Sequence, residues 1–266
     1  MSTAATALRI ASACAIIAAA LSAATPQAQP APPDTRRSGF ADMSPATQAM
    51  QRDDTANPAM LWVKEGEALW QRPAGAANKA CITCHAQAAS SMRGVAARYP
   101  AWDTTQGKPI TLSQRINQCR QQHQQAAPQK PESEEALSLE AYVAHQSRGM
   151  PITPPTDPRL AAARERGEAL WRQRIGQVNL SCAQCHDARA GQRLAGSVIP
   201  QGHATGYPLY RLEWQGVGSL ERRIRGCMTG VRAEAYGFDS RELGELQVYL
   251  AGRAAGMSVE TPGVRP

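Results

Sequence analysis

The sequence has few aromatic residues and, beyond its N-terminus, no apolar run long enough to cross a membrane. Aromatic side chains make up 5% of the 266 residues, and a spanning helix needs roughly 20 consecutive apolar residues, so we expect no membrane span. Acidic residues are the minority charge, with 22 Asp and Glu against 29 Lys and Arg. The resulting charge of +7 argues against an acid-rich disordered chain and permits anionic partners. We expect no nucleic-acid partner.

The first 24 residues have the pattern of a secretory signal. Arg9 is followed by an apolar stretch from Ile10 to Leu21 and then by the small residues Ser22, Ala23 and Ala24. This order predicts a signal peptide over residues 1–24 that is cleaved on export. Cys14 lies inside it and could resemble a lipoprotein cysteine, but few apolar residues precede it, so we expect Cys14 to leave with the signal.

Six cysteines remain, and four of them form two Cys-x-x-Cys-His units. These are Cys81-Ile82-Thr83-Cys84-His85 and Cys182-Ala183-Gln184-Cys185-His186. Two thiols at this spacing reach the two vinyl groups of one porphyrin, and the adjacent histidine faces the iron. Two such units in an exported chain favour two covalently bound c-type haems over the alternatives of a redox dithiol, zinc ligands or disulfides.

The two units belong to an internal repeat. The pentapeptide Gly-Glu-Ala-Leu-Trp at 66–70 returns at 167–171, and Tyr99-Pro100 returns as Tyr207-Pro208. The repeat predicts a mainly α fold built from two tandem domains of the class I cytochrome c type, related by internal duplication. The predicted boundaries are an N-terminal extension over 25–57, a first domain over 58–150 and a second over 151–266.

Each copy is predicted to contain three helices. The first follows Asn57-Pro58 or Asp157-Pro158, and the second carries a late cysteine on the same face as two apolar residues. The third helix is expected over 133–145 and over 239–251, with Asp239 and Glu242 forming a capping box at the start of the latter. Prolines 151, 154 and 155 predict a stiff linker between the copies. Residues 25–57 show no clear period and could wrap either a partner or the second domain.

The sixth ligand of each iron is predicted from position in the repeat. His85 and His186 would each hold one face of a haem iron, which leaves the opposite face open. In small c-type cytochromes the distal ligand comes between the haem motif and the C-terminal helix, and Cys119 and Cys227 lie in that interval. We therefore expect two haems with histidine and thiolate ligands, at low potential because the anionic sulfur stabilises ferric iron.

Two alternatives for these cysteines stay open at this point. Met150 and Met257 also repeat and could supply a methionine ligand, or they could simply pack in the core. Cys119 and Cys227 could instead form a disulfide, as spare cysteines in exported proteins commonly do. A disulfide requires α-carbons within about 7 Å, which would demand an unusual docking of equivalent positions from two domains.

Arginines distinguish the surroundings of Cys227 from those of Cys119. Arg222, Arg223 and Arg225 precede Cys227, and Arg232 follows it, whereas Cys119 has fewer arginines nearby. Clustered guanidinium groups lower a thiol pKa and attract small anions, so these residues are candidates for binding a small, doubly charged sulfur anion. Alternatively, they form a solvated face or clamp haem propionates.

The order of these motifs resembles the SoxA family. The shared features are two Cys-x-x-Cys-His motifs, the intervening Cys119 and the run Arg-x-x-Gly-Cys-Met around Cys227. The resemblance covers nearly the whole mature chain. It implies the dihaem subunit of a periplasmic SoxAX complex that acts as an L-cysteine S-thiosulfotransferase. Such an enzyme joins thiosulfate oxidatively to a cysteine of the carrier SoxYZ and passes electrons to cytochrome c, assisted by the monohaem partner SoxX.

The resemblance also implies roles for individual residues. Cys227 would be both the distal ligand of the active-site haem and the catalytic cysteine, carried as a persulfide in the family. Arg223 would hold the substrate, with Arg222 and Arg225 as supporting charges. His85 and Cys119 would ligate the first haem, which we interpret as a relay or a relic because the arginine cluster is missing there.

Three other functions fit parts of the pattern. A tetrathionate-forming thiosulfate dehydrogenase would also be dihaem but would act without a carrier protein. A pure electron-transfer cytochrome would need no substrate pocket. A dihaem peroxidase would need an open sixth site, which two repeated cysteines argue against.

Overall fold

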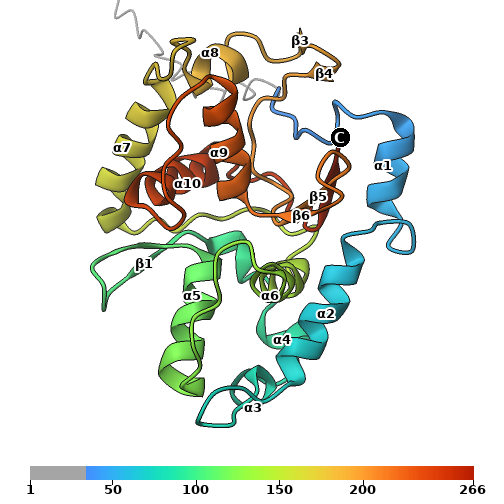
Figure 1. Cartoon of the computed structure of the whole chain (residues 1–266), viewed down its shortest axis with the longest axis vertical. Helices are drawn as coiled ribbons and strands as arrows, with labels where there is room; N and C mark the ends of the chain where they lie inside the picture. Colours follow the sequence, from blue (N-terminus) through green and yellow to red (C-terminus); the bar gives the residue numbers. More distant parts are fainter. Residues whose placement is uncertain (1–33) are drawn as a thin grey trace, which may run out of the picture. The chain divides into compact units, whose positions relative to one another are not determined.

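The computed structural model describes residues 34–266, so the predicted signal peptide and the first part of the extension lie outside the described residues. Residues 36–266 form one compact unit (Figure 1). Its elements before the linker are α1 (Pro45–Arg52), α2 (Met60–Gln71), α3 (Cys81–His85), α4 (Ala88–Ser91), the 3-10 turn η1 (Ala96–Arg98), β1 (Ala101–Asp103), β2 (Lys108–Ile110), α5 (Leu112–Cys119), the π-helical turn η2 (Arg120–Gln124) and α6 (Glu134–His145).

The elements after the linker repeat that order with additions. They are the 3-10 turn η3 (Pro158–Leu160), α7 (Ala161–Arg172), α8 (Cys182–His186), β3 (Arg193–Leu194), β4 (Ser197–Val198), β5 (Leu209–Arg211), β6 (Gly216–Gly218), α9 (Leu220–Gly230), α10 (Arg241–Arg253) and β7 (Gly263–Arg265). The mainly α fold and its internal duplication are therefore confirmed.

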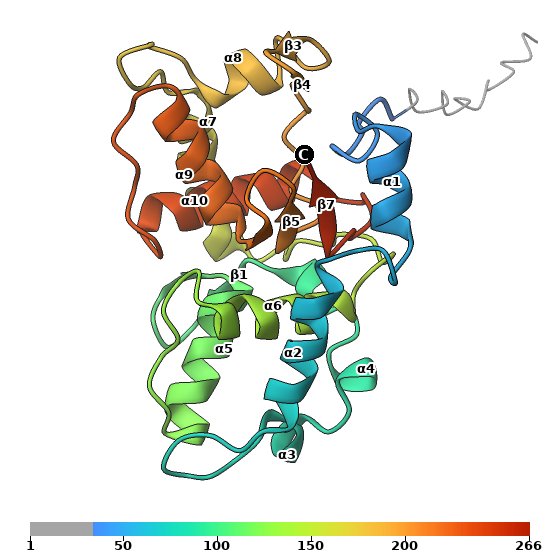
Figure 2. The same cartoon turned by 45° about the vertical axis from the view of Figure 1, so that its right-hand side comes forward.

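The first and third helices of each copy cross at close range, α2 on α6 and α7 on α10 (Figure 2). The repeated glycine of the Gly-Glu-Ala-Leu-Trp motif makes this possible. A Cβ at Gly66 would lie 2.1 Å from the carbonyl oxygen of Ser138, and one at Gly167 would lie 2.1 Å from that of Glu245. Any side chain here would push the helices apart. The motif thus encodes a helix crossing, and its tryptophans Trp70 and Trp171 are buried behind it.

The second helix of each copy follows a short antiparallel hairpin that the sequence analysis did not predict. β1 pairs with β2, and β5 pairs with β6 in the equivalent register. In the second copy β7 adds a parallel strand to β5, which gives the order β6-β5-β7. These strands have only three residues each, too few for an alternating pattern to emerge from the sequence.

The third helix of the second copy starts later than predicted. Ser240, not Asp239, caps α10, since its side chain accepts a hydrogen bond from the backbone N–H of Leu243. Asp239 has a positive φ of 59°, and its backbone N–H donates to Glu221 Oε2 at 2.9 Å. The proposed capping box between Asp239 and Glu242 is therefore wrong. Asp239 belongs to the turn that precedes the helix, where its backbone binds Glu221.

The described part of the N-terminal extension packs on the second copy. Arg36 donates to the carbonyl oxygens of Arg253 and Ala255 at 3.0 and 2.9 Å. Further along, Gln51 accepts from the backbone N–H of Val264 at 2.9 Å, so α1 lies against β7 (Figure 2). Of the two possibilities left open by the sequence, the structure supports wrapping around the second copy.

The proline-rich linker forms backbone hydrogen bonds with both copies. The backbone N–H of Thr153 donates to Ala97 in the first copy, and that of Ile152 donates to Met257 in the second, both at 2.8 Å. Side chains from both copies also share one buried cluster around Leu137 and Tyr210. The two copies therefore pack against each other and are not separate domains joined only by a spacer. In the described chain, no helix is both long and apolar enough to cross a bilayer.

Candidate functional site

The second Cys-x-x-Cys-His unit forms the short helix α8, and its own sequence organises the start of that helix. Ser181 accepts a hydrogen bond from the backbone N–H of Gln184 at 3.2 Å. The Gln184 side chain in turn accepts from the backbone N–H of Ser181 at 2.9 Å. This reciprocal capping box holds Cys182 and Cys185 in one helical turn. Gln184, one of the two intervening residues of the motif, therefore has a structural role.

His186 is held in one orientation from two sides. Its Nδ1 lies 2.7 Å from the carbonyl oxygen of Pro200, and because a carbonyl only accepts, Nδ1 must donate. Its ring packs against Trp171 with centroids 5.6 Å apart, and the Trp171 Nε1 donates to Asp187 Oδ2 at 2.9 Å. A histidine that donates from Nδ1 presents Nε2 as a metal ligand.

Cys227 faces this histidine from α9. The apolar face of α9, with Leu220 and Ile224, packs in the same cluster as Cys182, as the helical periodicity predicts. Burial by itself raises the pKa of the Cys227 thiol, but a hydrogen bond with the His186 ring and the nearby charge of Arg223 outweigh it, so the pKa lies below its ordinary value. The structure thus brings His186 and Cys227 together and favours the thiolate.

The arginines predicted around Cys227 separate into two groups. The charge of Arg223 helps to lower the pKa of the Cys227 thiol. Arg222 instead lies over the Trp214 ring at 4.2 Å and 3.9 Å from Glu132, and Arg225 lies over the Phe238 ring at 4.3 Å. Neither is among the charges that lower the Cys227 pKa most.

A fifth arginine near Cys227 was not predicted from the sequence. Arg211 on β5 also lowers the pKa of the Cys227 thiol, although it lies 16 positions earlier in the chain. The signal that could have found it is the repeat itself, since Arg211 occupies the position equivalent to Asp103.

The first copy shares part of this arrangement. His85 lies on α3 with its ring 5.6 Å from that of Trp70, the same separation as in the second copy. The Cys119 thiol on α5 is a close neighbour of Cys84, and Gln124 Nε2 lies 3.8 Å from Cys81 Sγ.

The electrostatics of the two late cysteines differ. Burial raises the pKa of Cys119, and the opposing charge of Arg115 does not overcome it. The pKa of Cys227 is lowered in the second copy. The contrast agrees with the arginine count in the sequence and assigns the more reactive thiolate to the second copy.

The structure also bears on the alternatives for the sixth ligands. Cys119 and Cys227 are both free thiols rather than a disulfide. Met257 packs in a buried apolar cluster with Ala97, Ile152 and Val259, which is the core role considered for it.

The donor set of each copy fits a c-type haem. Two thiols and one imidazole project from a single helical turn, and a third thiol comes from the following helix. In the second copy the Nδ1 of His186 is engaged with Pro200, which leaves Nε2 as the ring nitrogen that can bind a metal. Burial and the neighbouring Cys227 raise the pKa of the Cys182 thiol to about 11.

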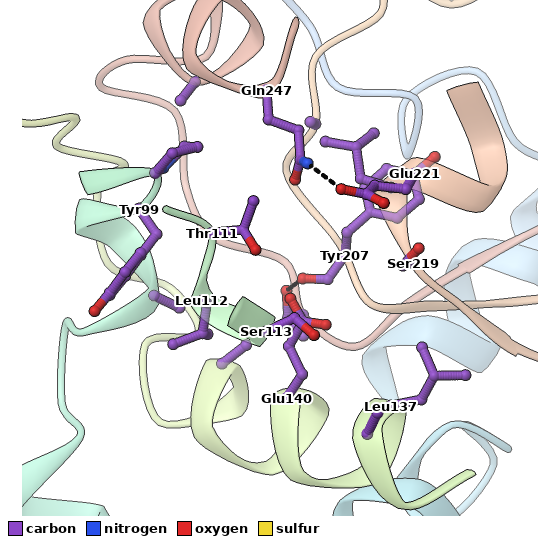
Figure 3. Close-up of a pocket in the computed structure, with 18 of the residues that line it drawn as sticks. Tyr99, Thr111, Leu112, Ser113, Leu137, Glu140, Tyr207, Ser219, Glu221 and Gln247 are labelled. Atoms are coloured by element: carbon purple, nitrogen blue, oxygen red, sulfur yellow. Dashed lines mark hydrogen bonds between the residues drawn. The ribbon is translucent and has the colours of Figure 1, made fainter. Parts of the chain in front are cut away.

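A cavity of about 140 Å³ lies elsewhere, between the two copies. Figure 3 shows Glu140 from α6, with Glu221 and Gln247 from the second copy joined by a hydrogen bond of 3.0 Å. None of the predicted cysteine, histidine or arginine site residues lines it. We therefore do not assign the substrate to this cavity.

Comparison with known proteins shows the family. The family model of the SoxA/TsdA cytochrome c domain matches twice, over residues 65–152 and 166–259. The chain is 39% identical to the L-cysteine S-thiosulfotransferase subunit SoxA of Pseudaminobacter salicylatoxidans, an alignment that covers 91% of this chain and 85% of that one. The chain belongs to the SoxA family.

Further relatives match over a similar share of the chain. The SoxA subunit from Rhodovulum sulfidophilum is 35% identical, with coverage of 87% and 81%. Among solved structures, the SoxXA crystal structure from P. pantotrophus superimposes with a TM-score of 0.84 at 31% identity, covering 87% of each chain. Both cytochrome c domains of this SoxA-family chain therefore have counterparts of known structure.

Proposed function

We propose that this SoxA-family chain is the catalytic subunit of an L-cysteine S-thiosulfotransferase, which conjugates thiosulfate oxidatively to a cysteine of a SoxYZ carrier. The observation that carries the proposal is the pairing of a low-pKa Cys227 with Arg223 beside the Cys-x-x-Cys-His helix. Relatives of this length that bear the transferase name support it.

Two haem c groups would be attached, one through Cys81 and Cys84 and the other through Cys182 and Cys185. His85 with Cys119 would bind the iron of the first haem, and His186 with Cys227 that of the second. When bound, the second haem supplies a redox centre next to Cys227 that takes up electrons for transfer to cytochrome c.

Arg223 would bind the thiosulfate dianion. Its guanidinium forms no salt bridge or side-chain hydrogen bond within residues 34–266, and a guanidinium matches the planar edge of an oxyanion. Arg222 and Arg225 would add supporting charge at the rim, because aromatic rings hold them in place. Bound in this way, the outer sulfur of thiosulfate is directed at Cys227 Sγ.

The chemistry balances in two steps. In the first, a bond forms between the Cys227 thiolate and the outer sulfur of thiosulfate, with loss of two electrons, to give a Cys227 S-thiosulfonate. In the second, the carrier thiolate attacks that outer sulfur, the new sulfur–sulfur bond to the carrier forms, and the Cys227 thiolate leaves. The low pKa of Cys227 favours it both as attacking thiolate and as leaving group.

The partners follow from this reaction. A SoxX-type monohaem cytochrome would form a heterodimer with this chain, as supported by the similar solved structure, which is that of SoxXA. A SoxYZ-type carrier would accept the group, and a soluble cytochrome c would accept the electrons. The predicted signal peptide supports a periplasmic location.

The experiment is thiosulfate-dependent reduction of cytochrome c by the purified complex with its SoxX-type partner. The proposal predicts reduction only when a SoxYZ-type carrier is present. Reduction without carrier, accompanied by tetrathionate, would instead identify a thiosulfate dehydrogenase. No reduction under either condition would favour the electron-transfer cytochrome.

A further inference from the structure

The internal duplication shows one place where the two copies reverse a charge. Asp103 is the last residue of β1, and Arg211 is the last residue of β5. Both strands pair with an equivalent partner in the same register. Each residue also precedes the late cysteine of its copy, Cys119 or Cys227, by the same number of positions. A carboxylate in the first copy is thus replaced by a guanidinium in the second.

In the first copy this carboxylate neutralises the arginine that both copies of the repeat share. Asp103 Oδ2 lies 3.0 Å from Arg115 Nη1 and accepts from Gln118 Nε2 at 3.0 Å. The Asp103 side chain is only 1% exposed, and backbone N–H groups of Thr105 and Gln106 satisfy its other oxygen. Arg115 and Asp103 therefore neutralise each other, and the protein's own carboxylate is the anion beside this arginine.

In the second copy the arginine remains but its carboxylate is gone. Arg223 stands where Arg115 does, opposite Arg211 instead of an aspartate. The Arg211 side chain is 12% exposed, and its Nε is buried without a hydrogen-bond partner among the described residues. Its Nη2 forms an ion pair with the exposed Glu213 Oε2 at 2.7 Å, and its guanidinium carbon lies 5.2 Å from the centre of the Trp214 ring. The glutamine at 118 is matched by Gly226, which removes side-chain volume from the same place.

Both guanidinium groups act on the same buried groups. The charges of Arg223 and Arg211 both lower the pKa of the Cys227 thiol. Both charges also counteract the rise that burial causes in the pKa of the Tyr207 hydroxyl. Glu213 pairs with one edge of Arg211, but Arg223 has no ion-pair partner within residues 34–266 and the Arg211 Nε has no acceptor there. Two half-buried like charges are more favourable when a further anion lies between them. Such an arrangement persists when it serves a ligand that supplies the missing negative charge.

We propose that Arg211 and Arg223 together form a two-arginine site for the divalent oxyanion end of thiosulfate, with Arg211 as a second substrate-binding residue contributed by β5. The bound oxyanion takes the position that the Asp103 carboxylate occupies in the first copy. This proposal rests on the proposed function, since it deepens the substrate contacts of the same site. It also explains why only one of two duplicated haem sites binds substrate.

The test uses two substitutions in the holoprotein complex with its SoxX-type partner. Arg211→Gln removes the charge, and Arg211→Asp restores the ion pair with Arg223 that the first copy already tolerates. We expect the KM for thiosulfate to rise at least about tenfold in Arg211→Gln and further in Arg211→Asp, with the KM for the carrier unchanged. Calorimetric titration with thiosulfate should show the same weakening of Kd. Arg172→Gln, which removes an exposed charge from α7, should leave both constants unchanged.

Other outcomes are distinguishable. If Arg211→Gln keeps the wild-type KM and Kd for thiosulfate but loses haem or shifts the haem absorption spectrum, Arg211 clamps a haem propionate and the proposal is overturned. If it keeps all of these properties, the proposal is also overturned. If the wild-type complex transfers nothing to the carrier, the proposed function fails. The binding site then still stands if thiosulfate binds to the wild type and not to Arg211→Asp, and it falls if neither binds.

Discussion

Arg115 and Arg223 are the same residue of the repeat in different surroundings. Arg115 is tied to the buried Asp103 carboxylate at 3.0 Å, whereas no ion pair forms at Arg223 within residues 34–266. The position conserves a positive charge next to each late cysteine, but only the second copy leaves that charge available to a ligand. The distinction between a structural and a substrate-binding arginine therefore depends on the partner, not on the residue.

Arg223→Lys should impair the reaction although it conserves charge. An ammonium group cannot replace the planar fork of a guanidinium on an oxyanion. Loss of about 1.5–3 kcal/mol of charge-assisted hydrogen bonding corresponds to roughly 10- to 100-fold in kcat/KM for thiosulfate. Steady-state kinetics with carrier present measure it. Arg115→Lys is the matched control and should change this constant little, and near-normal kinetics in Arg223→Lys would count against the substrate role.

The two late cysteines should also respond differently to substitution. If the first haem is a relay or a relic, Cys119→Met should reduce turnover at least about tenfold less than Cys227→Met does. The reason is that only Cys227 is proposed to carry the thiosulfate group. Turnover is compared alongside the absorption spectrum of each haem. Complete loss of turnover in Cys119→Met, with the second haem intact, would disprove this interpretation.

At the scale of elements, the helices could be predicted more fully than the strands. The first helices follow Asn57-Pro58 and Asp157-Pro158 as predicted, although α2 and α7 begin after Ala59 and Leu160 without a side-chain cap. The α6 helix begins after Ser133 as expected. The three-residue strands and the added strand β7 could not be predicted, because their pairing is decided by contacts distant in sequence. The start of α10 was misplaced because Asp239 and Ser240 are both good capping residues, and tertiary contacts to Glu221 decided between them.

The corrected cap of α10 can be tested by stability. Ser240→Ala should lower the free energy of unfolding by about 1 kcal/mol, since it removes the hydrogen bond to the Leu243 N–H. Glu242→Ala should have a smaller effect, because Glu242 takes no part in a capping box. Denaturant unfolding followed by circular dichroism measures both. The reverse order of effects would restore the original capping box.

At the scale of the whole molecule, acidic groups gather where the two copies meet. Burial, together with the charges of Glu132, Glu221 and Asp239, raises the pKa of Glu140 to about 8. Burial also raises the pKa of Glu221 to about 7. Arg222, the cation on this cluster, lies 3.9 Å from Glu132. The folded protein therefore binds these protons more tightly than the unfolded chain does.

This arrangement predicts a stability that falls with pH. Because the folded pKa of Glu140 exceeds its ordinary 4.5, the free energy of unfolding should decrease as pH rises from about 4.5 to about 8, where the loss is complete. Glu140→Gln should be closer to wild-type stability at pH 5 and more stable than wild type at pH 9. Glu134→Gln, at an exposed position in the first turn of α6, is the control. Equal pH dependence in wild type and Glu140→Gln would contradict the argument.

The chemistry of the site could be predicted from the sequence more fully than the packing of the two copies could. The Cys-x-x-Cys-His units and the repeated cysteines are local patterns, and the structure brings His186 and Cys227 together as those patterns suggest. The shared core around Leu137 and Tyr210 and the arrival of Arg211 beside Cys227 depend on how strands and copies pack. Such contacts leave no local signal in a single sequence.

The most direct measurement is the mass of the carrier after incubation with thiosulfate, oxidised cytochrome c and the complex. The account predicts one thiosulfate group on the carrier cysteine for every two molecules of cytochrome c reduced, in keeping with the electron balance of the reaction. A carrier of unchanged mass while cytochrome c is reduced would contradict the account.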